Sequence, residues 1–277
     1  MIKLTEGLQS ASSIPLFTAM FAEGGGAGLA SIENMGITAQ PAKRELADGQ
    51  AAYDSAKLLG EELAALGLNL EFAPVADTAV DAEGEADARF YSADPAVVGT
   101  MAENTVRGLR DGGAATVLSH FPGQGSAVRD ESDGKLRSDR TYEELQEKEL
   151  LPFIGSISAG ADLVMVSHMI NASITKTDME CTMSTNVMTN ILRNTMGFPN
   201  VIITDTLSGQ GITGYYSAGA AALTAFEAGA DMLLLPENVE DAAAAIKGAV
   251  SSGRISEMRI NESVSRILKV KLERGII

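Results

Sequence analysis

Short apolar runs alternate along the chain with longer segments in which apolar residues recur every three or four positions. Runs of about four to eight apolar residues are typical of buried strands, and the longer spacing is typical of amphipathic helices. The sequence therefore predicts strands that alternate with helices. The strands cover residues 14–20, 68–75, 115–120, 163–167, 201–204 and 231–235. The helices cover residues 49–66, 95–111, 142–159, 184–196, 218–228 and 239–251.

This alternation predicts parallel βαβ units, in which each helix returns the chain to the start of the next strand. Few polar residues interrupt the strand runs, as expected for strands buried on both faces. Asp94 and Ser184 precede helical segments and are predicted helix starts. No linker, low-complexity segment or short repeat divides the chain, so we predict one α/β domain over residues 1–277.

The composition of the chain argues against nucleic acid as a partner and against a membrane span. The chain has 37 acidic and 21 basic residues, which gives a net charge of −16. Nucleic acid is not an expected partner, because binding phosphates needs a basic surface. No apolar run is long enough to cross a membrane, and the polar start MIKLTEGLQS lacks the apolar centre of a signal peptide. We expect neither a membrane span nor a secretory signal.

Cysteine and histidine are scarce. Cys181 is the single cysteine, so the sequence allows no internal disulfide and no cysteine-based metal cluster. The two histidines, His120 and His168, are too few for a histidine-rich metal site. This usage fits a cytoplasmic location, although an exported protein without disulfides would look the same.

Polar residues follow several of the predicted strands. Asp205 comes directly after the strand at 201–204, and His120, His168 and Asp77 end other apolar runs. Strand ends of this kind converge on one face of an α/β barrel, where such barrels carry their chemistry. Each residue also has a structural interpretation. Asp205 and Asp77 could hold loops through backbone N–H groups, and His120 could be a structural histidine.

Several segments resemble glycoside hydrolase family 3, in particular its β-N-acetylhexosaminidase branch. LRNTMGFPNVIITDTLSGQGI is similar to the segment that carries the family's catalytic aspartate, and SHFPGQG is similar to K-H-F-P-G-H-G. NLEFAPVAD and ADLVMVSH also match, and the resemblance covers nearly the whole chain. It implies a TIM-like (β/α)8 barrel. Family members have a further helix and first strand upstream, so we expect this chain to lack them, either as a natural short form or because its start is missing.

The resemblance assigns roles residue by residue. It makes Asp205 the nucleophile. It makes Arg89 a contact to the sugar, although a surface salt bridge is the alternative interpretation. The substrate-binding side chains that it implies are Glu23, Asp77, Arg89, His120 and His168.

The chain departs from the family pattern at several of these places. The family's loop histidine, its general acid/base, is absent, and the aligned triplet is Glu131-Ser132-Asp133. Glu131 or Asp133 could substitute as the acid if its pKa were raised, and the alternative is a solvated acidic loop. Four other family residues are also replaced. The sugar-binding aspartate and the arginine of D-Q-E-G-G-R are Phe21 and Gly26, and the lysine and second histidine of K-H-F-P-G-H-G are Ser119 and Gln124.

The leading hypothesis is a retaining β-N-acetylglucosaminidase acting on peptidoglycan or chitin-type fragments. The alternative is a catalytically impaired family member that acts as a binding or scaffold protein. An unrelated barrel enzyme is a weaker option, because neither a strand-end lysine nor a phosphate loop is evident. The resemblance implies no metal and no organic cofactor. An incomplete barrel would expose strand edges, which predicts a possible homo-oligomer.

Overall fold

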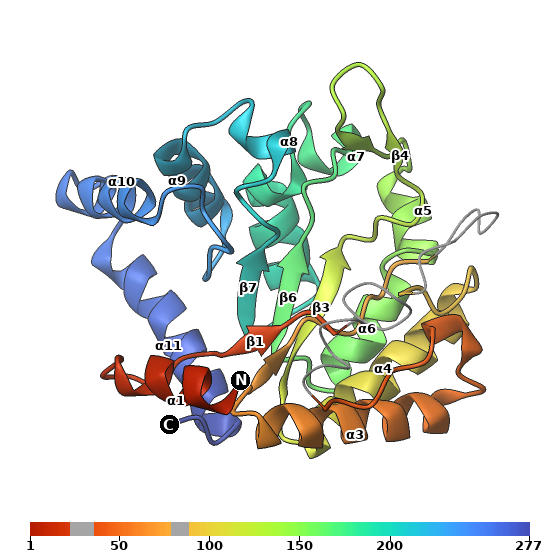
Figure 1. Cartoon of the computed structure of the whole chain (residues 1–277). Coiled ribbons are helices and arrows are strands. Elements are labelled where there is room, and N and C mark those ends of the chain that lie inside the picture. Colours follow the sequence, from red (N-terminus) through yellow and green to blue (C-terminus); the bar gives the residue numbers. More distant parts are fainter. Residues whose placement is uncertain (23–35, 79–88) are drawn as a thin grey trace. The chain divides into compact units, whose positions relative to one another are not determined.

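The computed structural model describes residues 1–22, 36–78 and 89–277 (Figure 1). The chain contains two compact units, and each is described by itself. The first unit comprises Met1–Ser119, Glu147–Leu163 and Leu268–Ile277. The second unit comprises His120–Gln146 and Val164–Ile267.

The first unit contains the start of a parallel sheet. Strands β1 (Ala19–Met20), β2 (Leu70–Glu71) and β3 (Ala115–Phe121) pair in this order, with Ala19 opposite Leu70 and Leu70 opposite Ala115. The last two residues of β3 belong to the second unit. The helices of this unit are α1 (Ile2–Ser10), η1 (Lys43–Glu45), α3 (Gly49–Ala65), α4 (Pro95–Asp111) and α6 (Leu151–Ser158).

Helices α3 and α4 lie side by side (Figure 1) and approach closely because glycines face the contact. A Cβ atom on Gly108 would lie 2.3 Å from the carbonyl oxygen of Tyr53, and one on Gly112 would lie 2.4 Å from that of Lys57. Any larger residue would push the two backbones apart. The predicted start of α4 is confirmed, because the Asp94 side chain accepts a hydrogen bond from the Ala96 amide at 2.8 Å.

The second unit continues from β3. Strand β6 (Leu163–Val166) lies next to β7 (Val201–Thr204), and the hairpin of β4 (Val128–Arg129) and β5 (Leu136–Arg137) is antiparallel. The short helical elements are α5 (Tyr142–Glu147), α7 (Ala172–Thr175), η2 (Cys181–Met183) and α8 (Gln210–Thr213). The longer ones are the π-helix η3 (Asn186–Thr195), α9 (Ala218–Ala228), α10 (Val239–Ser251) and α11 (Glu257–Glu273), whose residues from Leu268 on belong to the first unit.

A buried carboxylate joins several of these elements. The side chain of Asp231 has no exposed surface, and its Oδ2 accepts hydrogen bonds from Arg193 of η3 at 2.6 Å and from the Ile202 amide of β7 at 3.0 Å. Its Oδ1 accepts from Ser263 at 2.6 Å and from Arg266 at 2.9 Å, both in α11. Burial lowers the pKa of Arg193 to about 10, and the charge of Asp231 opposes that shift. This carboxylate therefore fixes β7 against two helices.

The α/β class with parallel strands is confirmed. The strands predicted at 14–20 and 68–75 are shorter, because only Ala19–Met20 and Leu70–Glu71 are strands, and the helix predicted from Ser184 is the π-helix η3, which begins at Asn186. Two further elements also differ. Residues 231–235 form an isolated parallel bridge between Met232 and Ile203 instead of a strand. The helix predicted at 142–159 is divided into α5 and α6. Pro152 lies in the first turn of α6 and, within a continuous helix, would clash with the carbonyl four residues earlier. The closed barrel and the single domain stay predictions. Among the described residues, none of the helices has the length and apolarity that a membrane crossing requires.

We expect Asp231→Asn to lower the free energy of unfolding by about 3 kcal/mol, because it removes the charge that balances a buried guanidinium. Urea unfolding followed by circular dichroism measures this change. Glu237→Gln makes the same carboxylate-to-amide replacement at an exposed position and is the control. Equal stability of the two variants would contradict the role given to Asp231.

Candidate active site

Asp205 follows β7 directly and is half-buried. Its amide donates to the carbonyl of Val166 in β6 at 2.9 Å, so the backbone pairing of the two strands continues to this residue. Its Oδ1 accepts a hydrogen bond from the Thr206 amide at 2.6 Å. The strand end therefore holds the carboxylate at a defined place.

His168 follows β6 and holds the loop that carries Asp205. Its Nε2 lies 2.9 Å from the carbonyl oxygen of Thr206, and its Nδ1 lies 2.7 Å from the hydroxyl of Thr182. A carbonyl only accepts hydrogen bonds, so Nε2 carries a proton. In the neutral ring, Nδ1 then accepts from the Thr182 hydroxyl. His168 thus lies beside the candidate nucleophile and orients the residue after it.

The segment that follows β6 is paired on two sides. On one side, the Ile170 amide donates to the carbonyl of Leu136 in β5 at 2.8 Å. On the other side, Cys181 donates to the carbonyl of Met169 at 2.9 Å, and Ile170 forms an antiparallel bridge with Glu180. Backbone hydrogen bonds therefore bring the β4–β5 hairpin and residues 180–182 to the two sides of one strand extension.

The hairpin between β4 and β5 carries most of the predicted acidic loop. Arg137 of β5 pairs with Asp130 at 3.1 Å and with Asp133 at 2.6 Å, and it also pairs with Asp178. Asp130 also accepts hydrogen bonds from the amide and hydroxyl of Ser132, at 2.9 and 2.6 Å. The loop is a hydrogen-bonded turn whose negative charges gather around one guanidinium.

These contacts favour the charged form of Asp133. The Lys135 amide and then the Arg137 guanidinium, which both donate to its carboxylate, lower the pKa of Asp133. A general acid needs the opposite shift. Glu131 is exposed at the tip of the hairpin and has no ion pair among the described residues. The environment of Asp133 therefore weighs against it as a proton donor, and both assignments stay predictions.

A hollow of about 180 Å³ lies against Asp205, within the second unit. Gln124 is part of its wall and donates to the Ser167 hydroxyl at 2.7 Å. The residues of this wall that have polar or charged side chains are Gln124, Arg129, Lys135, His168 and Asp205. Most of its wall is apolar, with a small number of polar groups, which is the usual make-up of a small-molecule site.

Lys135 and its partners were not predicted from the sequence. Its ammonium lies 2.8 Å from Oε1 of the buried Glu180 and 3.5 Å from the centre of the Tyr215 ring. Tyr216 donates to the other oxygen of Glu180 at 3.1 Å. No motif marks these residues, because the contact depends on the pairing of Ile170 with both flanking segments.

The remaining predicted site residues are distributed over the chain. His120 belongs to the second unit and is partly exposed at the end of β3. Asp77 is buried and Arg89 is partly exposed, and both belong to the first unit. Glu23 lies outside the described residues. The sugar-binding roles of these residues stay predictions.

Phe21, predicted from the motif resemblance to replace a sugar-binding aspartate, is half-exposed. Its ring stacks on that of Phe72 in the first unit, with 4.1 Å between the ring centres and 10° between the ring planes. Its neighbour Ala22 donates to the buried Glu71 carboxylate at 2.7 Å. This strand end therefore carries an aromatic pair on its side chains, and the Glu71 carboxylate holds its backbone.

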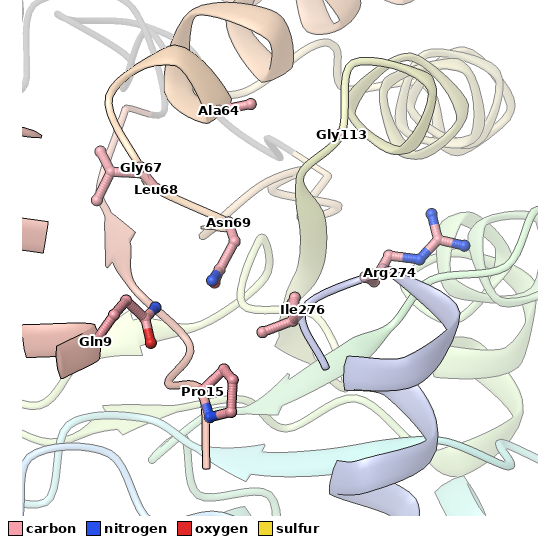
Figure 2. A pocket seen from close by; sticks show the side chains of 10 residues that line it. Gln9, Pro15, Ala64, Gly67, Leu68, Asn69, Gly113, Arg274 and Ile276 are labelled. Atoms are coloured by element: carbon pink, nitrogen blue, oxygen red, sulfur yellow. The ribbon is translucent and has the colours of Figure 1, made fainter. Parts of the chain in front are cut away.

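A second hollow, of about 460 Å³, lies within the first unit (Figure 2). Figure 2 shows Gln9 and Asn69 in its wall, with Ile276 opposite them. The amide of Gln9 exchanges two hydrogen bonds with the Leu16 backbone, and Asn69 binds the backbones of Leu16 and Thr18. Both amides thus hold the segment before β1, which is a structural role.

The second unit thus presents a hollow beside a carboxylate at the end of a strand. The chain has the α/β architecture of the class of domains whose sites lie at the carboxyl ends of their strands. The glycosyl hydrolase family 3 N terminal domain matches residues 3–270. The chain belongs to this family, which confirms the prediction made from its motifs.

Relatives match over nearly the whole chain. Beta-hexosaminidase A of Pseudoalteromonas piscicida is 29% identical over 303 residues, which cover 98% of this chain and 50% of that protein. A beta-hexosaminidase of Xylella fastidiosa (strain M12) is 31% identical over 259 residues, which cover 91% of this chain and 76% of that protein.

Solved structures agree. A glycoside hydrolase family 3 beta-N-acetylglucosaminidase from Paenibacillus sp. str. FPU-7 has a TM-score of 0.88 and 32% sequence identity, over 99% of this chain and 54% of that one. The chain thus spans about half the length of that protein and of the Pseudoalteromonas protein.

We expect Arg137→Met to raise the pKa of Asp133, because it removes one of the groups that favour the charged carboxylate. The pKa of Asp133 is lowered in the folded protein, so its stabilising contribution is present above the pKa of the unfolded chain and is lost as the pH falls. A carboxyl-carbon NMR titration measures the shift. Arg254→Met, which breaks an exposed pair with Glu227, is the control. An unchanged titration of Asp133 would contradict this account.

Proposed function

We propose that this chain is the catalytic domain of a glycosidase that hydrolyses terminal β-linked N-acetylhexosamine with retention of configuration. The observation that carries the proposal is the half-buried Asp205 at the end of β7, beside a hollow, in a chain that matches family 3 from residue 3 to residue 270. The named relatives are hexosaminidases, which supports N-acetylglucosamine-containing glycans of peptidoglycan or chitin type as substrates.

The mechanism has two displacement steps. A carboxylate oxygen of Asp205 attacks the anomeric carbon and forms a glycosyl–enzyme ester, while the bond to the glycosidic oxygen breaks. The departing oxygen takes a proton from an acid, or leaves as an anion when it is a good leaving group. Water then attacks the same carbon, loses a proton and releases Asp205. The Thr206 amide, 2.6 Å from the carboxylate, orients it for the attack.

The general acid is the part of this mechanism for which the structure offers fewer candidates. We propose that Glu131 supplies the proton, because Asp133 is held in its charged form by the Lys135 amide and Arg137. Glu131 lies at the exposed tip of the hairpin. A good leaving group departs without a proton, so turnover of substrates with poor leaving groups depends most on this acid.

We expect Asp205→Ala to lower turnover of p-nitrophenyl β-N-acetylglucosaminide by about a thousandfold or more, because the covalent step loses its nucleophile. Release of p-nitrophenol measures it. The matched control is Asp241→Ala, which removes an exposed carboxylate from α10. Wild-type turnover in the Asp205 variant would show that the nucleophile assignment is wrong.

A comparison of leaving groups tests the acid. We expect Glu131→Gln to lower kcat/KM for phenyl β-N-acetylglucosaminide about a hundredfold, and to change hydrolysis of the 2,4-dinitrophenyl glycoside little. A good leaving group departs without a proton, so it does not need the acid. Asp133→Asn is the matched variant and should preserve the activity on both substrates. Equal losses on both substrates in Glu131→Gln would contradict a proton-donating role.

A further inference from the structure

We infer that Lys135 is a substrate-binding residue of the Asp205 hollow, and that its ammonium donates a hydrogen bond to an oxygen of the bound sugar. The inference rests on the proposed function in taking the ligand to be a saccharide. Its basis is the position of Lys135, which forms part of the same wall as Asp205, Gln124 and His168.

The ammonium is fixed by two groups from elsewhere in the second unit, and a third residue holds one of them. Its side chain is only 11% exposed, and that of its partner Glu180 is 2% exposed. Glu180 accepts at 2.8 Å, and the face of Tyr215 lies 3.5 Å away, at a distance typical of a cation–π contact. Tyr216 donates to the second oxygen of Glu180 and holds the carboxylate in place.

The orientation of the hairpin also depends on backbone pairing. Lys135 precedes β5, whose Leu136 carbonyl accepts from Ile170, and Ile170 is bridged to Glu180. Lys135 therefore reaches across one strand extension to its partner. Ordering a lysine side chain costs conformational entropy. Because Lys135 is already ordered by its partners in the protein, binding a ligand does not add this cost.

An ammonium has three hydrogens. Glu180 accepts one, and the Tyr215 ring takes a second direction, so among the described residues a donor remains for a ligand in the hollow that Lys135 lines. A charge-assisted hydrogen bond to a sugar oxygen is stronger than one between neutral groups. Because Glu180 balances the charge, the ligand need not be an anion, and hydroxyl and amide oxygens of an uncharged sugar fit this donor.

The test is the affinity for N-acetylglucosamine, measured by isothermal titration calorimetry, since this monosaccharide binds without turnover. We expect Lys135→Met to raise the Kd about tenfold or more, because the charged donor is lost. Lys247→Met makes the same replacement at an exposed position of α10 and should bind as the wild type does. Wild-type affinity in Lys135→Met, or no sugar binding by the wild type, would overturn the inference.

A second variant separates binding from a purely structural role. Lys135→Met leaves Glu180 buried without its cation, which can destabilise the fold. The double variant Lys135→Met/Glu180→Gln removes both charges and keeps an acceptor for Tyr216. We expect it to melt close to the wild type and still to bind the sugar weakly. Recovery of wild-type affinity in the double variant would show that Lys135 acts only through the fold, and would overturn the inference.

These outcomes differ from a failure of the proposed function. If Asp205→Ala abolishes hydrolysis while Lys135→Met binds and hydrolyses normally, the glycosidase proposal stands and this inference fails. If the wild type hydrolyses no glycoside but its sugar affinity depends on Lys135, the inference stands and the glycosidase proposal fails.

Discussion

The buried carboxylate of Asp231 ties together a strand and two helices of the second unit. It receives a guanidinium from η3, a guanidinium and a hydroxyl from α11, and the Ile202 amide of β7. An ion of this kind costs several kcal/mol to bury, and only a complete set of partners offsets that cost. Any displacement of the two helices would leave the charge unpaired. Asp231 therefore fixes the position of β7 at Ile202, and with it the position of Asp205 three residues later in the chain.

The wall of the site is held mainly by backbone hydrogen bonds. Residues 167–170 extend β6, and the hairpin and residues 180–182 pair with their two edges. Side chains then connect across this arrangement. His168 reaches Thr206 on one side and Thr182 on the other, and Lys135 reaches Glu180. Because the backbone sets the spacing, the loops can carry unusual residues while the position of the carboxylate is kept.

Much of this could be predicted from the sequence. Apolar runs and helix starts located β6, β7 and α4, since burial on both faces and capping leave local signals. The position of Asp205 at a strand end followed from the run before it. Other features are set by contacts distant in sequence. The pair of Lys135 and Glu180 needs two segments to meet at Ile170, and the division of the helix at 142–159 depends on a single proline, Pro152. The spacing of apolar residues predicts neither the ion pair nor the division of the helix.

The charges of the hairpin bear most directly on the chemistry. Three carboxylates and two cations occupy residues 129–135, yet they are not equivalent. Asp130 and Asp133 are held ionised by hydrogen bonds, above all from Ser132 and from the Lys135 amide, and by Arg137. They serve to order the turn, which in turn places Lys135 beside the hollow. These two carboxylates are therefore poor sources of protons. The same hydrogen bonds that give the hairpin a fixed shape thus limit proton donation by Asp130 and Asp133, and of the three carboxylates they leave Glu131 as the candidate acid.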